Sequence, residues 1–109
     1  MPKLNIKPLS VNQAWQGRRF KTPKYNKYIN DVCMLLPRSK MPNGKMSLEI
    51  VFGLSSRAAD IDNPLKCFID CLQKKYEFDD KMIYRLVVEK ELVKKGDEYI
   101  LFKLTDYLS

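Results

Sequence analysis

Histidine is absent from the 109 residues of this chain. Its absence excludes an imidazole general base, a histidine metal ligand and the histidine partner of a serine or cysteine nucleophile. Any catalysis must therefore use carboxylates, lysine, tyrosine or a metal ion. Cysteine is scarce as well: Cys33, Cys67 and Cys71 lack the spacing of a zinc site, so we expect reduced cysteines that pack in the core. Reduced cysteines make the cytoplasm the default location.

Long apolar runs are also missing. No stretch reaches the roughly 18 apolar residues of a membrane span, and the first residues, MPKLNIKPLS, lack the apolar segment of a secretory signal, so we expect neither feature. There are no internal repeats. The length predicts a single domain over residues 1–109 with a modest core, and a small core favours a dimer because association buries further surface.

Acidic residues are nearly missing from the first part of the chain. Residues 1–45 hold ten lysines and arginines against one acid, Asp31, whereas residues 46–109 hold ten against twelve acids, and the net charge is +7. A basic first part favours a polyanionic partner, nucleic acid before others. A basic surface that is simply solvated is the alternative, because many basic domains bind no specific partner.

Hydrophobic periodicity predicts an α+β fold, close to α/β, with a small mixed sheet of about four strands covered by two helices. Thr22 and Pro23 form a helix-start signal, and Pro37 stops the helix that follows. A second helix is predicted from Pro64 to a turn over residues 76–81. The expected strands cover residues 3–7, 47–52, 83–93 and 99–104, and residues 9–21 are expected to form an irregular loop.

Five acids gather around the second predicted helix: Asp60, Asp62, Asp70, Asp79 and Asp80. In extended backbone Asp60 and Asp62 would point to one face, and the loop after the helix could return Asp79 or Asp80 to them. Carboxylates held close together repel unless a cation or proton lies between them, and three carboxylates with water suit Mg²⁺. One or two such ions could activate water for attack on a phosphodiester. Asp-x-Asp alone is a weak signal.

Lys66 lies four residues after Asp62, so the two side chains share one helix face. A surface salt bridge is one interpretation, and a fixed positive charge beside a metal site, facing the scissile phosphate, is the other. Asp62 or Asn63 could also cap the helix, alone or together with a metal role. Asp70 comes one turn later, and we assign it no role beyond a solvated or lysine-paired position.

The stretch DIDNPLK over residues 60–66 is similar to the motif Asp-x-Asp-Asn-x-x-Lys of the RusA family of Holliday junction resolvases, which are common in phages and prophages. An amphipathic helix, the pair Asp79-Asp80 and a strand from Ile83 follow in the family's order. Upstream, residues 8–12 (PLSVN) and the basic stretch 17–28 resemble the family's N-terminal segment. The resemblance covers nearly the whole chain.

The resemblance implies Asp60, Asp62 and Asp80 as Mg²⁺ ligands, with Asp79 the uncertain member of its pair, and Lys66 as the catalytic lysine. It implies one or two Mg²⁺ per site, Mn²⁺ as a substitute and no organic cofactor. A homodimer, phage or prophage encoded, would make paired symmetric nicks in four-way DNA junctions in the cytoplasm of a bacterial host. The alternatives are a non-catalytic junction-binding module with the same fold and, more weakly, a protein-interaction domain.

The family often carries a basic run before its first aspartate, where this chain has only Arg57. We therefore expect phosphate contacts from upstream positions as well. Trp15 and Phe20 could stack on unpaired bases at the junction centre, whereas Tyr25 fits a core position better. The predicted DNA-binding residues are Arg18, Arg19, Lys21, Lys24, Lys27 and Arg57.

Overall fold

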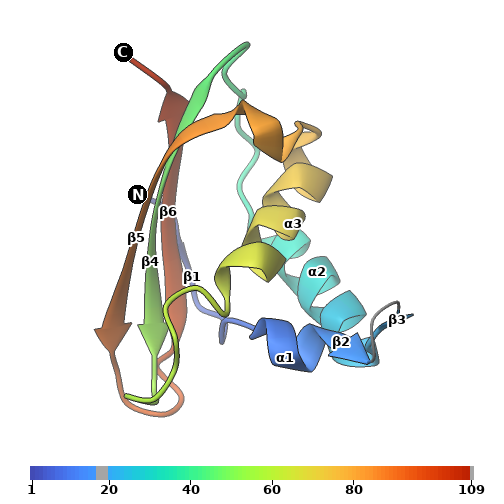
Figure 1. Cartoon of the computed structure of the whole chain (residues 1–109), viewed down its shortest axis with the longest axis vertical. Coiled ribbons are helices and arrows are strands. Elements are labelled where there is room, and N and C mark those ends of the chain that lie inside the picture. The colour runs from blue at the N-terminus through green and yellow to red at the C-terminus, as the bar shows by residue number, and fades with distance from the viewer. Residues whose placement is uncertain (17–19, 109) are drawn as a thin grey trace.

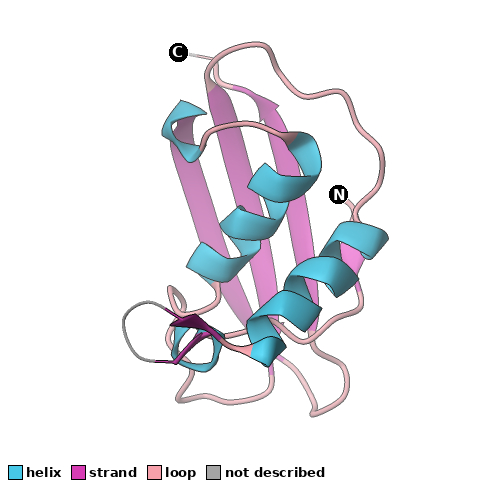
Figure 2. Cartoon of the chain, turned by 90° about the vertical axis from the view of Figure 1, so that its right-hand side faces the viewer, coloured by secondary structure: helices cyan, strands magenta, loops and turns pink. Residues whose placement is uncertain are grey.

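A computed structural model describes residues 1–16 and 20–108, with the side chains of Trp15, Gln16 and Phe20 outside the description. A four-stranded mixed sheet forms one layer, and two long helices cover one of its faces (Figure 1). Figure 2 shows the helix side, where both helices cross the strands obliquely. No helix in the described part of the chain is long and apolar enough to cross a membrane.

The sheet has the strand order β1-β6-β4-β5. β4 (Met46–Leu54) pairs antiparallel with β6 (Tyr99–Asp106), and β1 (Lys3–Leu4), shorter than predicted, extends the sheet beside β6. β5 (Ile83–Leu92) runs parallel to β4 at the other edge. Parallel neighbours require a crossover, which α3 (Leu65–Tyr76) and the short 3₁₀ helix η1 (Asp80–Met82) supply. The predicted fold class is confirmed.

α2 (Pro23–Leu35) forms where the helix-start signal predicts it. The Thr22 hydroxyl accepts a hydrogen bond of 3.2 Å from the Tyr25 amide, and Pro23 occupies the first turn, where a missing N–H leaves no bond unmade. Tyr25 and Tyr28 are buried in the core, each 5% exposed. The core position predicted for Tyr25 is therefore confirmed.

The start of α3 differs from the prediction. Pro64 occupies the N-cap position without a side-chain bond, so the expected cap by Asp62 or Asn63 was wrong. The physical reason is two successive turns: the Asn63 amide donates to the Asp60 carbonyl and the Leu65 amide to the Asp62 carbonyl, each at 3.2 Å. Because Asp62 lies within these turns, it does not share an extended segment with Asp60, and that expectation was wrong as well.

Residues 9–21 contain regular structure where we expected an irregular loop, so this prediction was wrong too. The Thr22 hydroxyl donates to the Gln13 carbonyl at 2.7 Å, and the Thr22 amide donates to the Ala14 carbonyl at 2.9 Å. These bonds tie the segment to the start of α2, a constraint that no local spacing reveals. The elements are α1 (Val11–Ala14), β2 (Trp15–Gln16) and β3 (Phe20–Lys21).

The three cysteines are free thiols. Cys67 and Cys71 are buried on α3, and Cys33 is half-buried on α2. Burial raises the pKa of the Cys67 thiol to about 11 and also raises the pKa of Cys71, so both thiols stay protonated at neutral pH. The predicted core role of the cysteines is confirmed.

Aromatic rings from the sheet and from α3 meet in the core. Phe68 on α3 has no exposed surface and lies edge-on to Phe52 of β4 and Phe102 of β6, with ring centroids 6.1 and 5.6 Å apart. Edge-on packing suits the charge distribution of the rings and stabilises beyond the area buried. These contacts fix how α3 is rotated on the sheet.

Gly53 allows the side chain of Tyr99 to lie across β4. A Cβ at position 53 would come within 2.4 Å of the Tyr99 ring. With no Cβ there, the Tyr99 hydroxyl reaches from β6 across β4 and donates to the Glu91 carboxylate on β5 at 2.5 Å. That hydrogen bond raises the pKa of Tyr99 to about 12. One side chain therefore links both neighbours of β4.

We predict that Gly53→Ala lowers the free energy of unfolding by about 1–3 kcal/mol, because the added methyl group must displace the Tyr99 ring. Gly44→Ala is the matched control, since a Cβ there would meet no atom within 4 Å, and its effect should stay within about 0.5 kcal/mol. Urea unfolding followed by circular dichroism measures both. Equal stabilities would show that the Tyr99 ring moves without cost.

Candidate functional site

The predicted site residues lie at the two ends of α3. Asp60 and Asp62 are exposed in the turns before the helix, and Lys66 is exposed in its first turn. Asp79 and Asp80 follow the helix, at the start of η1. α3 is about 18 Å long, since its 12 residues rise by about 1.5 Å each, but the segment after it turns back along the helix, because the Asp80 amide donates to the side chain of Gln73.

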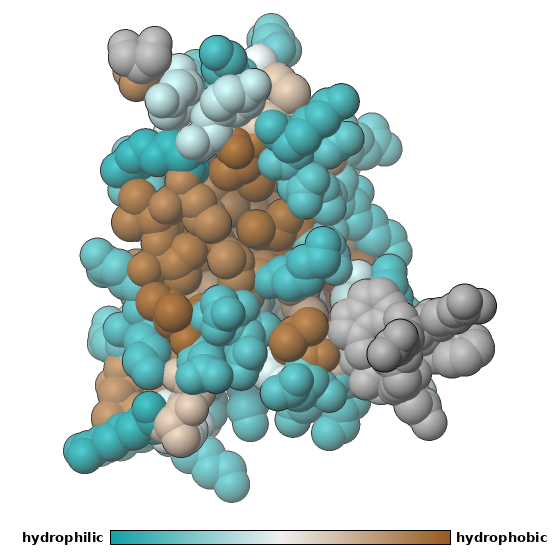
Figure 3. Space-filling model, viewed as in Figure 1, coloured by the Kyte–Doolittle hydropathy of each residue, from teal (hydrophilic) through white to brown (hydrophobic). Residues whose placement is uncertain are grey.

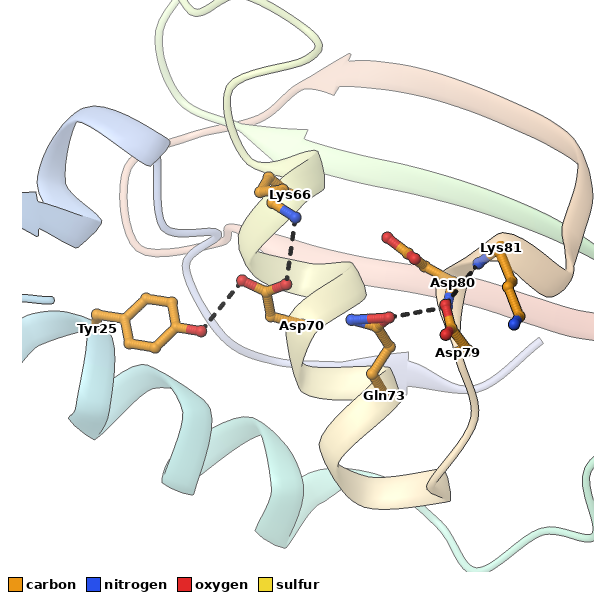
Figure 4. A network of polar contacts seen from close by, with 7 residues as sticks. All are labelled: Tyr25, Lys66, Asp70, Gln73, Asp79, Asp80 and Lys81. Carbon is orange, nitrogen blue, oxygen red and sulfur yellow. Dashed lines mark hydrogen bonds and ion pairs between the residues drawn. The ribbon is translucent and has the colours of Figure 1, made fainter. Parts of the chain in front are cut away.

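Lys66 pairs with Asp70, not with Asp62 (Figure 4). Its Nζ lies 3.8 Å from Oδ1 of Asp70, and the other oxygen of Asp70 accepts a hydrogen bond of 3.1 Å from the hydroxyl of Tyr25 on α2. The Lys66 side chain is 61% exposed, but that of Asp70 only 18%. The carboxylate is thus held between a buried ring and an exposed ammonium group.

The lysine-paired position that we allowed for Asp70 is confirmed, but sequence reasoning missed that Lys66 is its partner and that Tyr25 binds it. A carboxylate stands four residues before Lys66 and another four residues after it, so helical spacing alone cannot choose between Asp62 and Asp70. The structure chooses Asp70 because α3 starts after Asp62, whose backbone is turned, and because Tyr25 reaches Asp70 from another helix. The spacing of Lys66 and Asp70 was the only local signal.

The far end of α3 distinguishes Asp79 from Asp80. The Asp79 carboxylate accepts a bond of 3.0 Å from the Lys81 amide and caps η1, and this bond lowers the pKa of Asp79. The Asp80 amide donates to the side-chain oxygen of Gln73 at 2.8 Å, which ties the turn back to α3. In Figure 4 the Asp80 carboxylate extends toward α3. The Asp79 carboxylate therefore stabilises the turn itself. The Asp80 carboxylate is the stronger candidate for a catalytic or metal-binding role.

The carboxylates do not form a closed metal site. Within residues 1–16 and 20–108, no group of three His, Cys, Asp or Glu side chains lies close enough to hold an ion. The expectation that the loop after α3 returns a third carboxylate to Asp60 and Asp62 is not met in this part of the chain. Exposed carboxylates are the donors that Mg²⁺ prefers, so the chemistry of the donors fits such an ion.

The acidic turns lie against the N-terminal segment. The Val11 amide donates to the Asn63 carbonyl at 2.9 Å. Asp60 and Asn63 also line a cavity of about 270 Å³ together with Ser10 and Gln13. The structure therefore brings together two stretches that resemble separate motifs of the same family, residues 8–12 and residues 60–66.

The predicted DNA-binding residues are described in part. Lys24 and Lys27 are exposed on α2, where Lys27 pairs with Asp31 at 2.5 Å. Lys21 is exposed, with its Nζ 4.6 Å from the centroid of an aromatic ring of α2. Arg57 is exposed in the loop after β4. The predictions for Arg18 and Arg19, and for the side chains of Trp15 and Phe20, fall outside the described part of the structure.

A polar cleft of about 490 Å³ runs between α2 and α3. Side-chain amides and ammonium groups contribute most of its polar lining, and such donors suit phosphate oxygens. The cleft adjoins the carboxylate that holds Lys66, so it leads toward the first turn of α3. Its polar lining residues are Lys21, Asn26, Asn30, Asp70, Gln73 and Lys74.

Comparison with known proteins bears directly on this site. A model of the family described as endodeoxyribonuclease RusA matches residues 6–100, whereas no curated protein was found to match the chain. The matched range includes the acidic turns, α3, η1 and β5, and covers far more than half of the 109 residues. The chain therefore belongs to the RusA family of endodeoxyribonucleases, which resolve Holliday junctions.

Proposed function

We propose that this RusA-family enzyme cuts four-way DNA junctions in a Mg²⁺-dependent reaction, as a homodimer that makes paired symmetric nicks during recombination and repair. The observation that carries the proposal is the pair of exposed carboxylates, Asp60 and Asp62, in the turns that lead into the helix of Lys66. A DNA substrate of this kind would place the enzyme in the cytoplasm of a bacterial host.

The proposed roles follow from charge. Lys66 would face the scissile phosphate or the leaving oxygen and stabilise the negative charge that develops there. Asp60, Asp62 and Asp80 would supply carboxylate oxygens to the metal, and Mg²⁺, or Mn²⁺ in its place, would supply charge neutralisation and an activated water when bound. The donors of the cleft between α2 and α3 would hold backbone phosphates without reading the base sequence.

A labelled synthetic four-way junction, incubated with and without Mg²⁺, tests the proposal. We expect symmetric nicks from the unaltered chain and loss of cutting in Asp62→Asn. Junction binding by this variant should persist or tighten, because a negative charge that faces phosphate is removed. Asp97→Asn is the control: it removes the same charge from the exposed turn between β5 and β6 and should leave cutting unchanged.

Absence of symmetric nicks across metals and junction sequences would contradict the proposal. Equal junction binding with and without divalent metal, and no cutting, would support the non-catalytic module instead. Retention on heparin at low salt but not at high salt would argue against a protein-interaction domain, because phosphate contacts weaken steeply as salt rises.

Asp80→Asn and Asp79→Asn form a second matched pair. We expect Asp80→Asn to lower the single-turnover cleavage rate by about 100-fold, a typical loss for one electrostatic contact to the reacting group. Asp79→Asn should retain most of the activity, because an amide oxygen can still accept the bond from the Lys81 amide. The reverse ranking would identify Asp79 as the carboxylate of the site.

The edge strand β5 offers a surface for the proposed homodimer. Within the described chain it pairs with β4 on one side only. Leu86 and Leu92 of β5 are 43% and 51% exposed, and Figure 3 shows an apolar patch over β5 and α3. Exposed apolar edge strands tend to pair with a second chain, since their outer backbone groups lack partners.

Symmetry limits how β5 can pair with its own copy. In an antiparallel pair, two residues that lie opposite each other point to the same face of the sheet. A two-fold axis that relates two copies of β5 must therefore lie between one residue and its own copy, and not between two different residues. With the axis at Val87, Arg85 lies opposite Glu89 of the partner subunit, and Leu86 lies opposite the partner's Val88. With the axis at Val88, Val87 would lie opposite a glutamate. Charge and hydrophobicity therefore favour Val87.

Val87→Cys should form a disulfide with its own copy under mild oxidation, whereas Val88→Cys should not. Antiparallel neighbours have Cα atoms about 4.5–5.5 Å apart, within the range of a disulfide. Non-reducing electrophoresis measures the cross-link, with the unaltered chain as background for its three free cysteines. A monomeric mass by light scattering at micromolar concentration would contradict the homodimer, and cross-linking of Val88→Cys alone would move the axis by one residue.

A further inference from the structure

We propose that Asp70 is a positioning residue for Lys66: it fixes the ammonium group of Lys66 toward the reacting phosphate and is itself fixed by Tyr25. The inference rests on the proposed function, since it requires that Lys66 act on the scissile phosphate. It extends the lysine-paired position expected for Asp70 to a role in the reaction.

Three polar groups form a chain from the core to the surface (Figure 4). The Tyr25 hydroxyl donates to Oδ2 of Asp70 at 3.1 Å, and Oδ1 of Asp70 lies 3.8 Å from Nζ of Lys66. The exposed fraction rises along this chain from 5% for Tyr25 to 18% for the side chain of Asp70 and 61% for that of Lys66. The inner end is part of the packed core, and the outer end is exposed where a DNA strand can reach it.

Lys27 and Asp31 on α2 provide a comparison within the same chain. They have the same spacing of four residues and a contact of 2.5 Å, but their side chains are 77% and 41% exposed. Water screens such pairs, and both side chains lose rotational freedom to form them, so they are worth little. Asp70 differs because most of its side chain is buried and because a second bond, from Tyr25, holds its other oxygen.

A held carboxylate matters here because lysine is flexible. Its ammonium group sits on a four-carbon stem and swings through many rotamers unless a partner restrains it. A catalytic group misplaced by about 1 Å can cost about 100-fold in rate. Burial and the Asp70 charge raise the pKa of Tyr25, so its hydroxyl keeps its proton and remains a donor at physiological pH. The hydrogen bond that holds Asp70 beside Lys66 is therefore kept at physiological pH.

Asp70→Asn tests the inference, because it preserves the shape of the side chain and removes its charge. We expect the single-turnover cleavage rate at saturating protein to fall by about 10- to 100-fold, while junction affinity stays the same or rises. Asp31→Asn is the matched control. It removes the same charge from the exposed pair on α2 and should leave the cleavage rate at saturating protein unchanged. Asp70→Glu, which restores the charge, should recover part of the rate.

A double-mutant cycle separates positioning from structural damage. If Asp70 acts through Lys66, Asp70→Asn should cause no further loss in a Lys66→Ala background. Additive losses, or an unchanged rate in Asp70→Asn, would overturn the inference. Should Asp70→Asn fail to fold, Tyr25→Phe, which removes only the hydroxyl, takes its place in the same cycle with a smaller expected loss. An unaltered chain that cuts no junction would overturn the proposed function instead, so the two failures are distinguishable.

Discussion

The site depends on the position of α3 on the sheet, and Phe68 sets that position through its edge-on contacts with two rings of the sheet. With this side buried, another side of the helix presents Lys66, Asp70 and Gln73 at spacings of four and three residues. Each residue advances the helix by about 100°. A change of one residue in the seating of Phe68 would therefore turn the polar side chains away from their partners, so the apolar core determines the polar geometry.

α3 connects contacts that come from separate parts of the chain. Asp70 accepts a hydrogen bond from Tyr25 on α2. The side-chain oxygen of Gln73 accepts a hydrogen bond from the Asp80 amide, which lies in the turn beyond the helix. The turns before α3 receive a bond from the N-terminal segment, through the Asn63 carbonyl. The exposed carboxylates thus lie on turns that flank α3, a helix packed in the core. Such an arrangement holds a functional group in place and still leaves it open to solvent.

Features that depend on a few neighbouring residues could be predicted from the sequence. The start of α2 at Thr22 and the amphipathic character of α3 are of this kind, because capping and periodicity act locally. The cap of α3 could not, since Pro64 took the position expected of a polar side chain. The candidate site residues could be named from the sequence, but their arrangement could not: the partner of Lys66 is decided by Tyr25, on another helix.

The length of α3 can also be compared with the spacing of nucleotides along a DNA strand. Its 12 residues make it about 18 Å long, and a strand of duplex DNA advances by about 3.4 Å per nucleotide. A strand that contacts both ends of the helix in one chain must therefore follow it for about five nucleotides. The helix that carries Lys66 and packs in the core on its other side is thus about as long as five nucleotides of a DNA strand.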